Sequence, residues 1–567
     1  MNKFSNERVK GFLHIDGQKF VNGDGEQIIL RGWGTGNWTN PEGFMVGGPD
    51  SIRLTAENYN PVWFDRGRSM EAAIRELCGT EYAESFWPKW YRNHLGEADI
   101  KAMANLGYNS VRLVLSARAF LLEEPGITFN EDSFAMLDEI LNWCEKYKVY
   151  AILDLHGAPG GQSALAIDDG IDSVPHLFVD EESFERGLTL WEEFAVRYKD
   201  RWIVGGYDLL NEPLCMPEWQ HLLPKLIAFY DKAIERIRKH DKKHLFTIEG
   251  MSMATDLRVF CKDYDPECHN WCIHLHFYGF APEVASLYPY LSLAAKYNVP
   301  IWMGEGSLPP ADCAVFLDMA SEYGIGWNRW CWKVAENPER NTSRGVSYKL
   351  PDGWDEMKAF FAGGPKPGYL KSQAVFDQLL ANIRYENCIP SVETGNYQLR
   401  RPDIDLPAVG YDHNTVSGIT YSGDWEFGNI CSYRSADKMK MVLRPQVEMP
   451  ARMPAAYISP EEMKRGRRMR PKGPLELLML ELRKGEFTVY TIRDVVRPCS
   501  LTLELTTQED ATLEVKVTDH VLSVLEVSTK SALHDVFAGI IPEGEAQTIQ
   551  LTALCGSIGI ATLRFRY

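Results

Sequence analysis

The chain has 567 residues, 45% of them hydrophobic and 24% charged, which is typical of a globular protein with room for two domains. Its formal net charge of -18 argues against a nucleic-acid partner, because binding a phosphate backbone requires a net basic face. No run approaches the ~20 apolar residues of a membrane span, and residues 1–10 lack the apolar core of a secretory signal. We expect a cytoplasmic protein without nucleic-acid or membrane partners, or a secreted one if a leader has been removed.

The first part of the chain alternates strand-like apolar runs with helix-like segments, a pattern that predicts a parallel α/β sheet. Two short runs within residues 12–29 flank Asn22-Gly23-Asp24-Gly25 and predict a hairpin before the first strand. The predicted strands cover residues 28–33, 110–115, 149–155, 205–210, 245–249, 272–277, 301–304 and 326–330, with helices over 97–106, 132–146, 184–198, 222–240 and 311–323. Eight such strands predict a (β/α)8 TIM barrel, whose reactive residues sit at the C-terminal ends of the strands.

Two departures from the alternation bound the domains. Residues 35–89 form the largest insertion, between the first strand and the first clear helix, and we expect it on the catalytic face. All 16 tryptophans occur by Trp425, and short β-type runs follow at 416–421, 439–443, 487–492, 501–506, 512–517, 522–527, 548–552 and 561–566. The sequence therefore predicts a barrel over residues 1–395 and an all-β sandwich of the jelly-roll kind over 396–567.

Two carboxylates stand just where predicted strands stop. Glu212 ends the run Tyr207-Asp-Leu-Leu-Asn-Glu-Pro213, and Glu305 ends Ile301-Trp-Met-Gly-Glu. A barrel brings both to one rim, where one carboxyl group can protonate a glycosidic oxygen and the other can attack the anomeric carbon. Asn211 is placed to hydrogen-bond a sugar hydroxyl beside the reacting carbon. The pair predicts a glycoside hydrolase, with no cofactor.

Other strand-end residues fall on the same rim. Arg112 lies between apolar neighbours, so its buried cation needs a carboxylate such as Glu305. Aromatic faces suit stacking against a sugar ring, and an imidazole or phenol supplies a hydrogen bond. The remaining candidates for substrate binding are His156, His276, Tyr278, Trp330, Trp332 and, in the first loop, Trp38. Each has an ordinary structural reading alone; their common position at successive strand ends favours a site.

The cysteine and histidine content includes one cluster that resembles a metal site only loosely. Cys261, Cys268, His269, Cys272, His274 and His276 lie close in sequence, but their spacing matches no usual zinc pattern. Most of the twelve cysteines lie in or beside apolar segments and read as reduced core thiols. We expect no metal. A basic run within residues 463–472 reads as a solvated loop.

Taken together, these motifs resemble glycoside hydrolase family 5. The resemblance rests on NSVRL with Arg112, LDLHG with His156, Asn211-Glu212-Pro213, His276-Phe-Tyr278, MGEG with Glu305, and Trp330, and it spans about residues 20–390. It implies a retaining enzyme with Glu212 as acid/base and Glu305 as nucleophile, the other residues forming the active-site shell. The run LDLHGAPGGQ and the Trp332-Lys333 ending look closer to the exo-acting branches.

The C-terminal part resembles carbohydrate-binding modules of family 6. The resemblance lies in residues 406–429 and the final strands, and it implies sugar stacking on loop aromatics, here Tyr421, Trp425 and Tyr433. The later loops supply no tryptophan, and residues 445–474 interrupt the domain, so a purely structural sandwich stays open.

The sequence therefore predicts a retaining β-glycosidase that acts on short oligosaccharides or glycosides. An endo-acting glucanase or mannanase and a transglycosylase use the same machinery. A non-catalytic sugar-binding protein and a metal-dependent barrel hydrolase are the alternatives of other classes. Asn37, Trp38, Glu42 and Glu336 are the loop residues considered for reading the sugar's hydroxyls, and neither the sugar nor the oligomeric state follows from the sequence.

Overall fold

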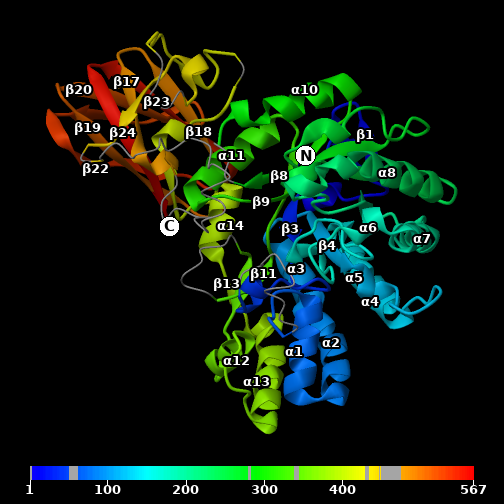
Figure 1. Ribbon diagram of the computed structural model, residues 1–567. Coiled ribbons are helices and arrows are strands. Elements are labelled where there is room, and N and C mark those ends of the chain that lie inside the picture. Colours follow the sequence, from blue (N-terminus) through cyan, green and yellow to red (C-terminus); the bar gives the residue numbers. More distant parts are fainter. Residues whose placement is uncertain are drawn as a thin grey trace.

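The computed structural model describes residues 3–49, 62–278, 282–336, 344–414, 416–427, 433–445, 447 and 474–567. Eight parallel strands close into a barrel in the order β10-β3-β4-β5-β6-β7-β8-β9 (Figure 1). They are β3 (Arg31–Gly34), β4 (Ser110–Ser116), β5 (Tyr150–Gly157), β6 (Val204–Asp208), β7 (Phe246–Glu249), β8 (Trp271–Tyr278), β9 (Ile301–Ser307) and β10 (Gly326–Arg329). The predicted TIM barrel is confirmed.

Helices cover the outside of the barrel, which explains why its strands are buried on both faces. Every residue of β4 and β5 is buried. In α5 (Glu131–Tyr147), Phe134, Leu137 and Leu141 recur at helical spacing and face the strands. The other long covering helices are α3 (Glu97–Asn105), α7 (Glu181–Tyr198), α8 (Leu223–Arg238), α10 (Tyr288–Tyr297) and α11 (Pro310–Glu322), with single turns at α4 (Ala117–Phe120), α6 (His176–Val179) and α9 (Met251–Ala254).

The N-terminal segment makes two successive turns, and the sequence predicted the second of them. Strands β1 (His14–Asp16) and β2 (Lys19–Val21) pair around Gly17, whose φ of 56° favours glycine. Asn22 begins the second turn, where its side-chain oxygen accepts hydrogen bonds from the backbone N–H groups of Asp24 and Glu26. The chain pairs across this turn as predicted, through an antiparallel bridge between Val21 and Gln27 and a hydrogen bond of 3.0 Å from the Ile28 N–H to the Phe20 carbonyl.

The insertion after β3 divides into two parts. Its first residues stay at the strand ends, where Met45 packs with Trp330. The rest includes α1 (Gly67–Cys78) and α2 (Thr80–His94), which pack on α12 (Trp354–Phe361) and α13 (Tyr369–Asn382) in a helical extension at the bottom of Figure 1. Thus only part of residues 35–89 lies on the catalytic face; residues 50–61 lie outside the described residues.

The C-terminal region consists of two antiparallel sheets. One has the order β16-β17-β24-β19-β22 with β14 beside β24, and the other β15-β18-β23-β20-β21. Their strands are β14 (Ile404–Pro407), β15 (Tyr421–Ser422), β16 (Lys440–Leu443), β17 (Leu478–Arg483), β18 (Phe487–Val495), β19 (Cys499–Thr507), β20 (Ala511–Val517), β21 (His520–Val527), β22 (Lys530–Ile541), β23 (Gly544–Cys555) and β24 (Ser557–Arg566). The all-β prediction is confirmed.

Two details of that region differ from prediction. Residues 416–421 do not form a strand, since only Tyr421 and Ser422 pair with β18. Strands β14, β17 and β22 were missed. Strand β22 lies at a sheet edge with most side chains at least partly exposed, so it lacks a clear alternation. Between barrel and sheets lie β11 (Lys333–Ala335), β12 (Val346–Tyr348), β13 (Ile389–Pro390) and α14 (Val392–Leu399), which crosses the predicted boundary at 395/396. That boundary stays a prediction.

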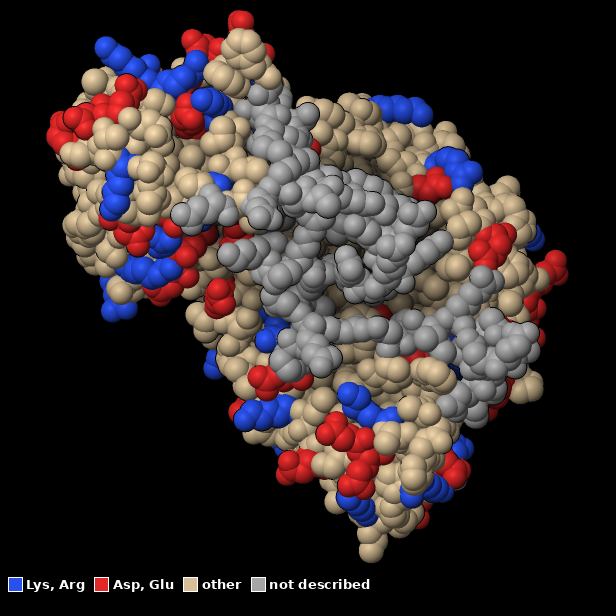
Figure 2. Space-filling model, turned by 60° about the vertical axis from the view of Figure 1, so that its left-hand side comes forward, with Lys and Arg blue, Asp and Glu red and all other residues tan. Residues whose placement is uncertain are grey.

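The sheets dock on helix α11 of the barrel. Ala314 and Val315 of α11 belong to the same apolar core as the sheets. Arg400 pairs with Asp318 of α11 at 3.3 Å and with Asp412 at 2.6 Å. On the face shown in Figure 2, acidic and basic side chains are interspersed over the sheets and the helical extension. Within the described ranges, no helix combines the length and apolarity needed to cross a membrane.

Candidate active site

The two predicted carboxylates meet at the C-terminal end of the barrel. Glu305 lies within β9, and Glu212 follows β6 in a turn where its φ is 41°. This left-handed conformation costs free energy for a residue with a side chain, and such strain clusters at functional sites. Oxygens of Glu212 and Glu305 and a nitrogen of His276 all lie within 4.8 Å of one another. The two carboxyl groups are therefore neighbours.

Glu305 is held by two donors. The Nη1 of Arg112 lies 3.0 Å from its Oε2, and the Tyr278 hydroxyl donates to its Oε1 at 2.6 Å. Burial and the adjacent Glu305 raise the pKa of Tyr278 well above its usual value, so the phenol keeps its proton. A guanidinium and a phenol therefore fix the orientation of this carboxylate.

Arg112 is the hub of the buried charges. Its Nε donates to Asp208 at 2.8 Å, and its Nη2 lies 3.1 Å from Asp154. Burial opposes its charge, but the carboxylates of Asp154, Asp208 and Glu305 outweigh burial and raise the pKa of Arg112 above its ordinary value. Every group in this cluster is fully or almost fully buried. The arginine prediction holds in position, and Asp154 and Asp208 are partners that the sequence reasoning did not name.

Asn211 uses its side-chain oxygen in a hydrogen bond within the protein, whereas its side-chain nitrogen has no partner among the described residues. Its Oδ1 accepts a hydrogen bond from Arg112 at 2.8 Å. Its Nδ2 is buried and has no partner among the described residues. Gln162, also missed, fixes this turn because its Nε2 donates at 2.8 Å to the carbonyls of both His156 and Asn211. The side-chain nitrogen of Asn211 is therefore fixed in position with its hydrogen-bonding capacity unused by the described part of the chain.

His156 and Trp330 form a flat wall. Their rings stack with centroids 5.1 Å apart and planes within 4°. His156 bonds Asp154 through Nδ1 at 2.8 Å, and burial, with a contribution from Arg112, lowers the pKa of His156 to about 4. Burial raises the pKa of Asp154 well above its usual value. The imidazole is therefore neutral at ordinary pH, and the wall is uncharged.

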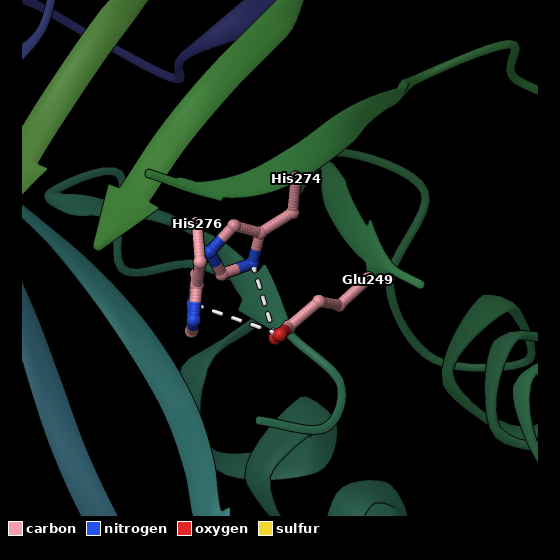
Figure 3. Close-up of side chains that lie close together, drawn as sticks. All are labelled: Glu249, His274 and His276. Carbon is pink, nitrogen blue, oxygen red and sulfur yellow. Dashed lines mark ion pairs between the residues drawn. The ribbon is translucent and has the colours of Figure 1, made fainter. Parts of the chain in front are cut away.

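His276 contacts the second carboxylate and leads to a third. Its Nδ1 lies 2.7 Å from Glu212 Oε1. On its other side, Nε2 lies 3.6 Å from Glu249 Oε1 (Figure 3). His274 bonds Asp208 through Nδ1 at 3.0 Å and lies 3.8 Å from Glu249. Glu249 ends β7 and was missed as a site residue, although its place at a predicted strand end was the same signal that singled out Glu212.

The cysteines and histidines of residues 261–276, which were considered as a metal site and rejected, do not come together as one cluster. Cys261 is exposed and Cys272 is buried in β8. Glu249, His274 and His276 do present ligand atoms within 4.8 Å of one another. The Nδ1 atoms of both histidines are bonded to Asp208 and Glu212, and Nε2 of His274 packs against Gly304. The absence of a metal stays a prediction.

Two predicted stacking residues lie in the core instead. Trp38 is fully buried, and its Nε1 donates to the carbonyl of Tyr91 in α2 at 3.1 Å. Trp332 is 1% exposed, and its Nε1 donates to Asp99 at 2.8 Å. Both prefer the interior because their rings pack there while the N–H finds a partner. Their packing argues against contact with substrate, and the substrate-binding role of Trp38 and Trp332 stays a prediction.

The aromatic candidates of the sheet region lie at its junction with the barrel. Tyr421 and Tyr433 are buried and line a pocket of about 370 Å³ together with Tyr288 and Tyr323 of the barrel. Trp425 lies elsewhere, under the cations of Lys440 at 4.9 Å and Arg483 at 5.4 Å. The three do not form one stacking site. The basic run at 463–472 lies outside the described residues.

Comparisons with known proteins agree with this geometry. Residues 68–336 match the family described as cellulase (glycosyl hydrolase family 5). Beta-xylosidase from Phanerodontia chrysosporium is 31% identical over 285 residues, which are 50% of this chain and 56% of that protein. Glucan 1,3-beta-glucosidase from Candida oleophila is 29% identical over 237 residues, 40% of this chain and 51% of that protein. The chain spans about half the length of these curated relatives.

Among solved structures, an endogalactoceramidase aligns with 97% of this chain and 100% of its own, at a TM-score of 0.44 and 14% identity, a likeness too low to support a conclusion. The sequence matches show that residues 68–336 are similar to glycosyl hydrolase family 5 and support a glycoside hydrolase.

Proposed function

We propose that this protein is a retaining β-glycosidase that removes single sugars from short oligosaccharides or glycosides. The observation that carries the proposal is the proximity of Glu212 and Glu305, whose oxygens lie within 4.8 Å. Carboxyl groups about 5 Å apart suit direct attack by one of them, whereas inverting enzymes keep them about 6.5–9.5 Å apart to admit a water.

In the first step, Glu305 attacks the anomeric carbon while Glu212 gives its proton to the departing oxygen. The glycosidic C–O bond breaks, and an ester joins the sugar to Glu305. Arg112 and Tyr278, both bonded to Glu305, orient the attacking carboxylate. The free Nδ2 of Asn211 is placed to bond the hydroxyl next to the reacting carbon.

In the second step, Glu212 takes a proton from a water, which attacks the same carbon and releases Glu305. The two inversions leave the configuration unchanged. His276 bonds Glu212 throughout at 2.7 Å and holds its orientation. If another sugar replaces the water, the same intermediate gives transglycosylation.

The preference for short substrates rests on the residues that pack near Glu212 and Glu305. The first residues of the insertion after β3 and the ring of Trp330 pack against each other beside Tyr278. Residues packed on this side of the two carboxylates favour an enclosed substrate pocket over an open cleft. The cytoplasmic location stays a prediction.

Product analysis tests this proposal. We expect aryl β-glycosides to be hydrolysed with the β-anomer appearing first in proton NMR, and Glu305→Gln to abolish turnover. An α-anomer as first product contradicts retention, and a rapid fall in the viscosity of soluble β-glucan or mannan indicates endo action. If neither wild type nor variant turns over any glycoside in the panel, a non-catalytic sugar-binding role replaces the enzyme.

A second proposal concerns the sheet region, which we propose contributes a weak sugar site. The pocket lined by Tyr421 and Tyr433 supports it. Calorimetry with cello- and xylo-oligosaccharides on Glu305→Gln tests it, because binding outside the barrel persists in Glu305→Gln/Trp330→Ala and disappears on adding Tyr421→Ala. Binding lost completely with Trp330→Ala alone leaves a structural sandwich.

A further inference from the structure

Glu249 is a buried carboxyl group with no role in the steps above. It is fully buried at the end of β7, and neither of its oxygens completes a hydrogen bond with the part of the chain that is described. The backbone N–H of Glu212 lies close enough to lower the pKa of Glu249, as the last of the effects on it, without meeting the geometry of a full hydrogen bond. Its nearest side-chain atoms are His276 Nε2 at 3.6 Å and His274 Nδ1 at 3.8 Å (Figure 3).

The groups around Glu249 come from several strands and helices. They carry more negative than positive charge, with one permanently charged cation against several carboxyl groups. Those that act on Glu249 or are acted on by it are Arg112, Asp208, Glu212, Cys215, Tyr230, His274, His276 and Tyr290. Isolated buried charges are costly, so a proton is expected on some of these groups.

The balance of these effects favours a proton on Glu249. Burial, and then Glu212 and Asp208, raise the pKa of Glu249 well above its usual value, while Arg112 opposes them. Burial lowers the pKa of His276 well below its usual value, although Glu305 opposes it, so the imidazole is neutral and carries one N–H. A neutral imidazole between two carboxyl groups donates on one side and accepts on the other.

His276 Nε2 also lies 3.8 Å from Glu305, so a second acceptor has to be considered. Both oxygens of Glu305 already accept a donor, one from Arg112 and one from Tyr278. Those of Glu249 do not. The open partner of Nε2 is therefore Glu249.

We propose that Glu249 is a positioning residue that shares one proton with Glu212 through His276. The inference rests on the proposed function, because it assumes Glu212 as the acid/base. In one form Glu212 is ionised, His276 carries its proton on Nδ1, and Glu249 is protonated. In the other, Glu249 has given its proton to Nε2, and Nδ1 has given its proton to Glu212. No proton or charge is gained or lost by the chain.

The exchange serves both halves of the reaction. The form with protonated Glu212 donates to the leaving oxygen, and the form with ionised Glu212 accepts a proton from water. Two carboxyl groups that share one proton cannot easily both ionise, so Glu249 keeps the acid form of Glu212 available at higher pH.

Kinetics with Glu249→Gln test the sharing. We expect the alkaline limb of kcat/KM for a phenyl β-glycoside to move about one unit to lower pH, because Glu212 loses its like-charged neighbour. A 2,4-dinitrophenyl glycoside, whose leaving group needs no proton, should lose less than about threefold. Glu249→Asp should restore part of the limb, and Glu486→Gln, a buried glutamate of the sheets, should leave it unchanged.

If Glu249→Gln loses activity equally on both substrates, Glu249 is purely structural and the proposal is overturned. An alkaline limb of kcat/KM that does not move in Glu249→Gln also overturns it. If that variant does not fold, the same limb is read in Glu249→Asp, where no shift overturns it. Infrared difference spectra at pH 7 give a readout without turnover. The protonated carboxyl band of wild type should weaken in Glu249→Gln and not in Glu486→Gln. If the band is the same in wild type and Glu249→Gln, the proposal is overturned. This outcome is separate from failure of the proposed function, because it can be measured even if the wild type hydrolyses nothing.

Discussion

The rim of the barrel and its junction with the sheets are both rich in buried charge and aromatic rings, but they are built differently. At the rim, Asn211, His276 and Glu249 keep buried polar atoms without a hydrogen-bond partner within the described ranges. At the junction, the residues lining the pocket have no such atom among those described. Arg434 bonds Asp437 at 2.6 Å and the Tyr411 carbonyl at 2.6 Å, and Tyr411 donates to Asp437.

This difference separates a site from a structural interface. Folding normally satisfies buried polar groups, since each one left alone costs about 1–3 kcal/mol. A cluster of exceptions at the rim, together with the strained backbone of Glu212, indicates groups held ready for a ligand. Junction aromatics can offer a sugar stacking but few free donors, so any binding there should be weak.

Replacing the nucleophile should give the largest effect. Glu305→Ala is expected to lower kcat at least about 10⁴-fold, because it removes the atom that forms the covalent bond. Azide should then restore turnover and give a glycosyl azide of inverted configuration, measured by NMR. The matched control is Asp437→Asn at the junction, which should change kcat less than about twofold. A glycosyl azide of retained configuration contradicts the role of Glu305 as nucleophile. A loss of kcat in Asp437→Asn as large as in Glu305→Ala contradicts the distinction between rim and junction.

The stability of the rim depends on Arg112, the cation that three buried carboxylates share. Arg112→Met leaves Asp154, Asp208 and Glu305 without their shared partner, and should lower the free energy of unfolding by about 3–5 kcal/mol in urea titrations. Arg75→Met removes an exposed pair with Glu71 in α1 and should cost less than about 1 kcal/mol. A loss at Arg112 no larger than at Arg75 contradicts the picture of an interdependent charge network.

The strand ends of the barrel could be predicted because a TIM barrel converts sequence position into spatial proximity. Arg112, Asn211, Glu212, His276 and Glu305 all follow or lie in strands that the apolar runs mark, and they meet at the rim. Glu249 obeys the same rule. It was passed over although Gly250 follows it as Gly306 follows Glu305, because it belongs to none of the family motifs. Strand position therefore deserved more weight than motif.

Residues in loops were harder to place, because loops carry no fixed geometry. Trp38 and Trp332 have the right composition for sugar stacking, yet tertiary packing turns their rings inward, against Tyr91 and Asp99. The helices of the insertion were also missed. They bury aromatic residues such as Phe64 and Phe86 against a segment nearly 300 positions later, a partner that the local sequence does not reveal.

The two tryptophans that follow β10 should separate binding from stability. Trp330→Ala removes the ring stacked on His156 and should raise KM about 10- to 100-fold, about 1.4–2.8 kcal/mol, with a small change in Tm. Trp332→Phe should leave KM unchanged and lower the free energy of unfolding by about 1–3 kcal/mol, since it vacates a fully packed position. The opposite assignment of KM and stability effects would restore Trp332 as a substrate contact.

The smallest effect is expected at the junction, from His413. The Tyr323 hydroxyl lies 2.7 Å from its Nε2, and burial, with a contribution from Arg434, lowers the pKa of His413. The unfolded chain therefore binds a proton there more readily than the folded one, and this residue reduces stability as pH falls below about 6.5. His413→Gln keeps an acceptor or donor but does not titrate. Urea titrations at pH 7 and pH 5 should show the variant losing less stability than wild type, by under about 1 kcal/mol because the site is half-exposed, with kcat unchanged within twofold. A large drop in kcat without a change in that pH slope contradicts a structural junction and extends the substrate site to the sheets.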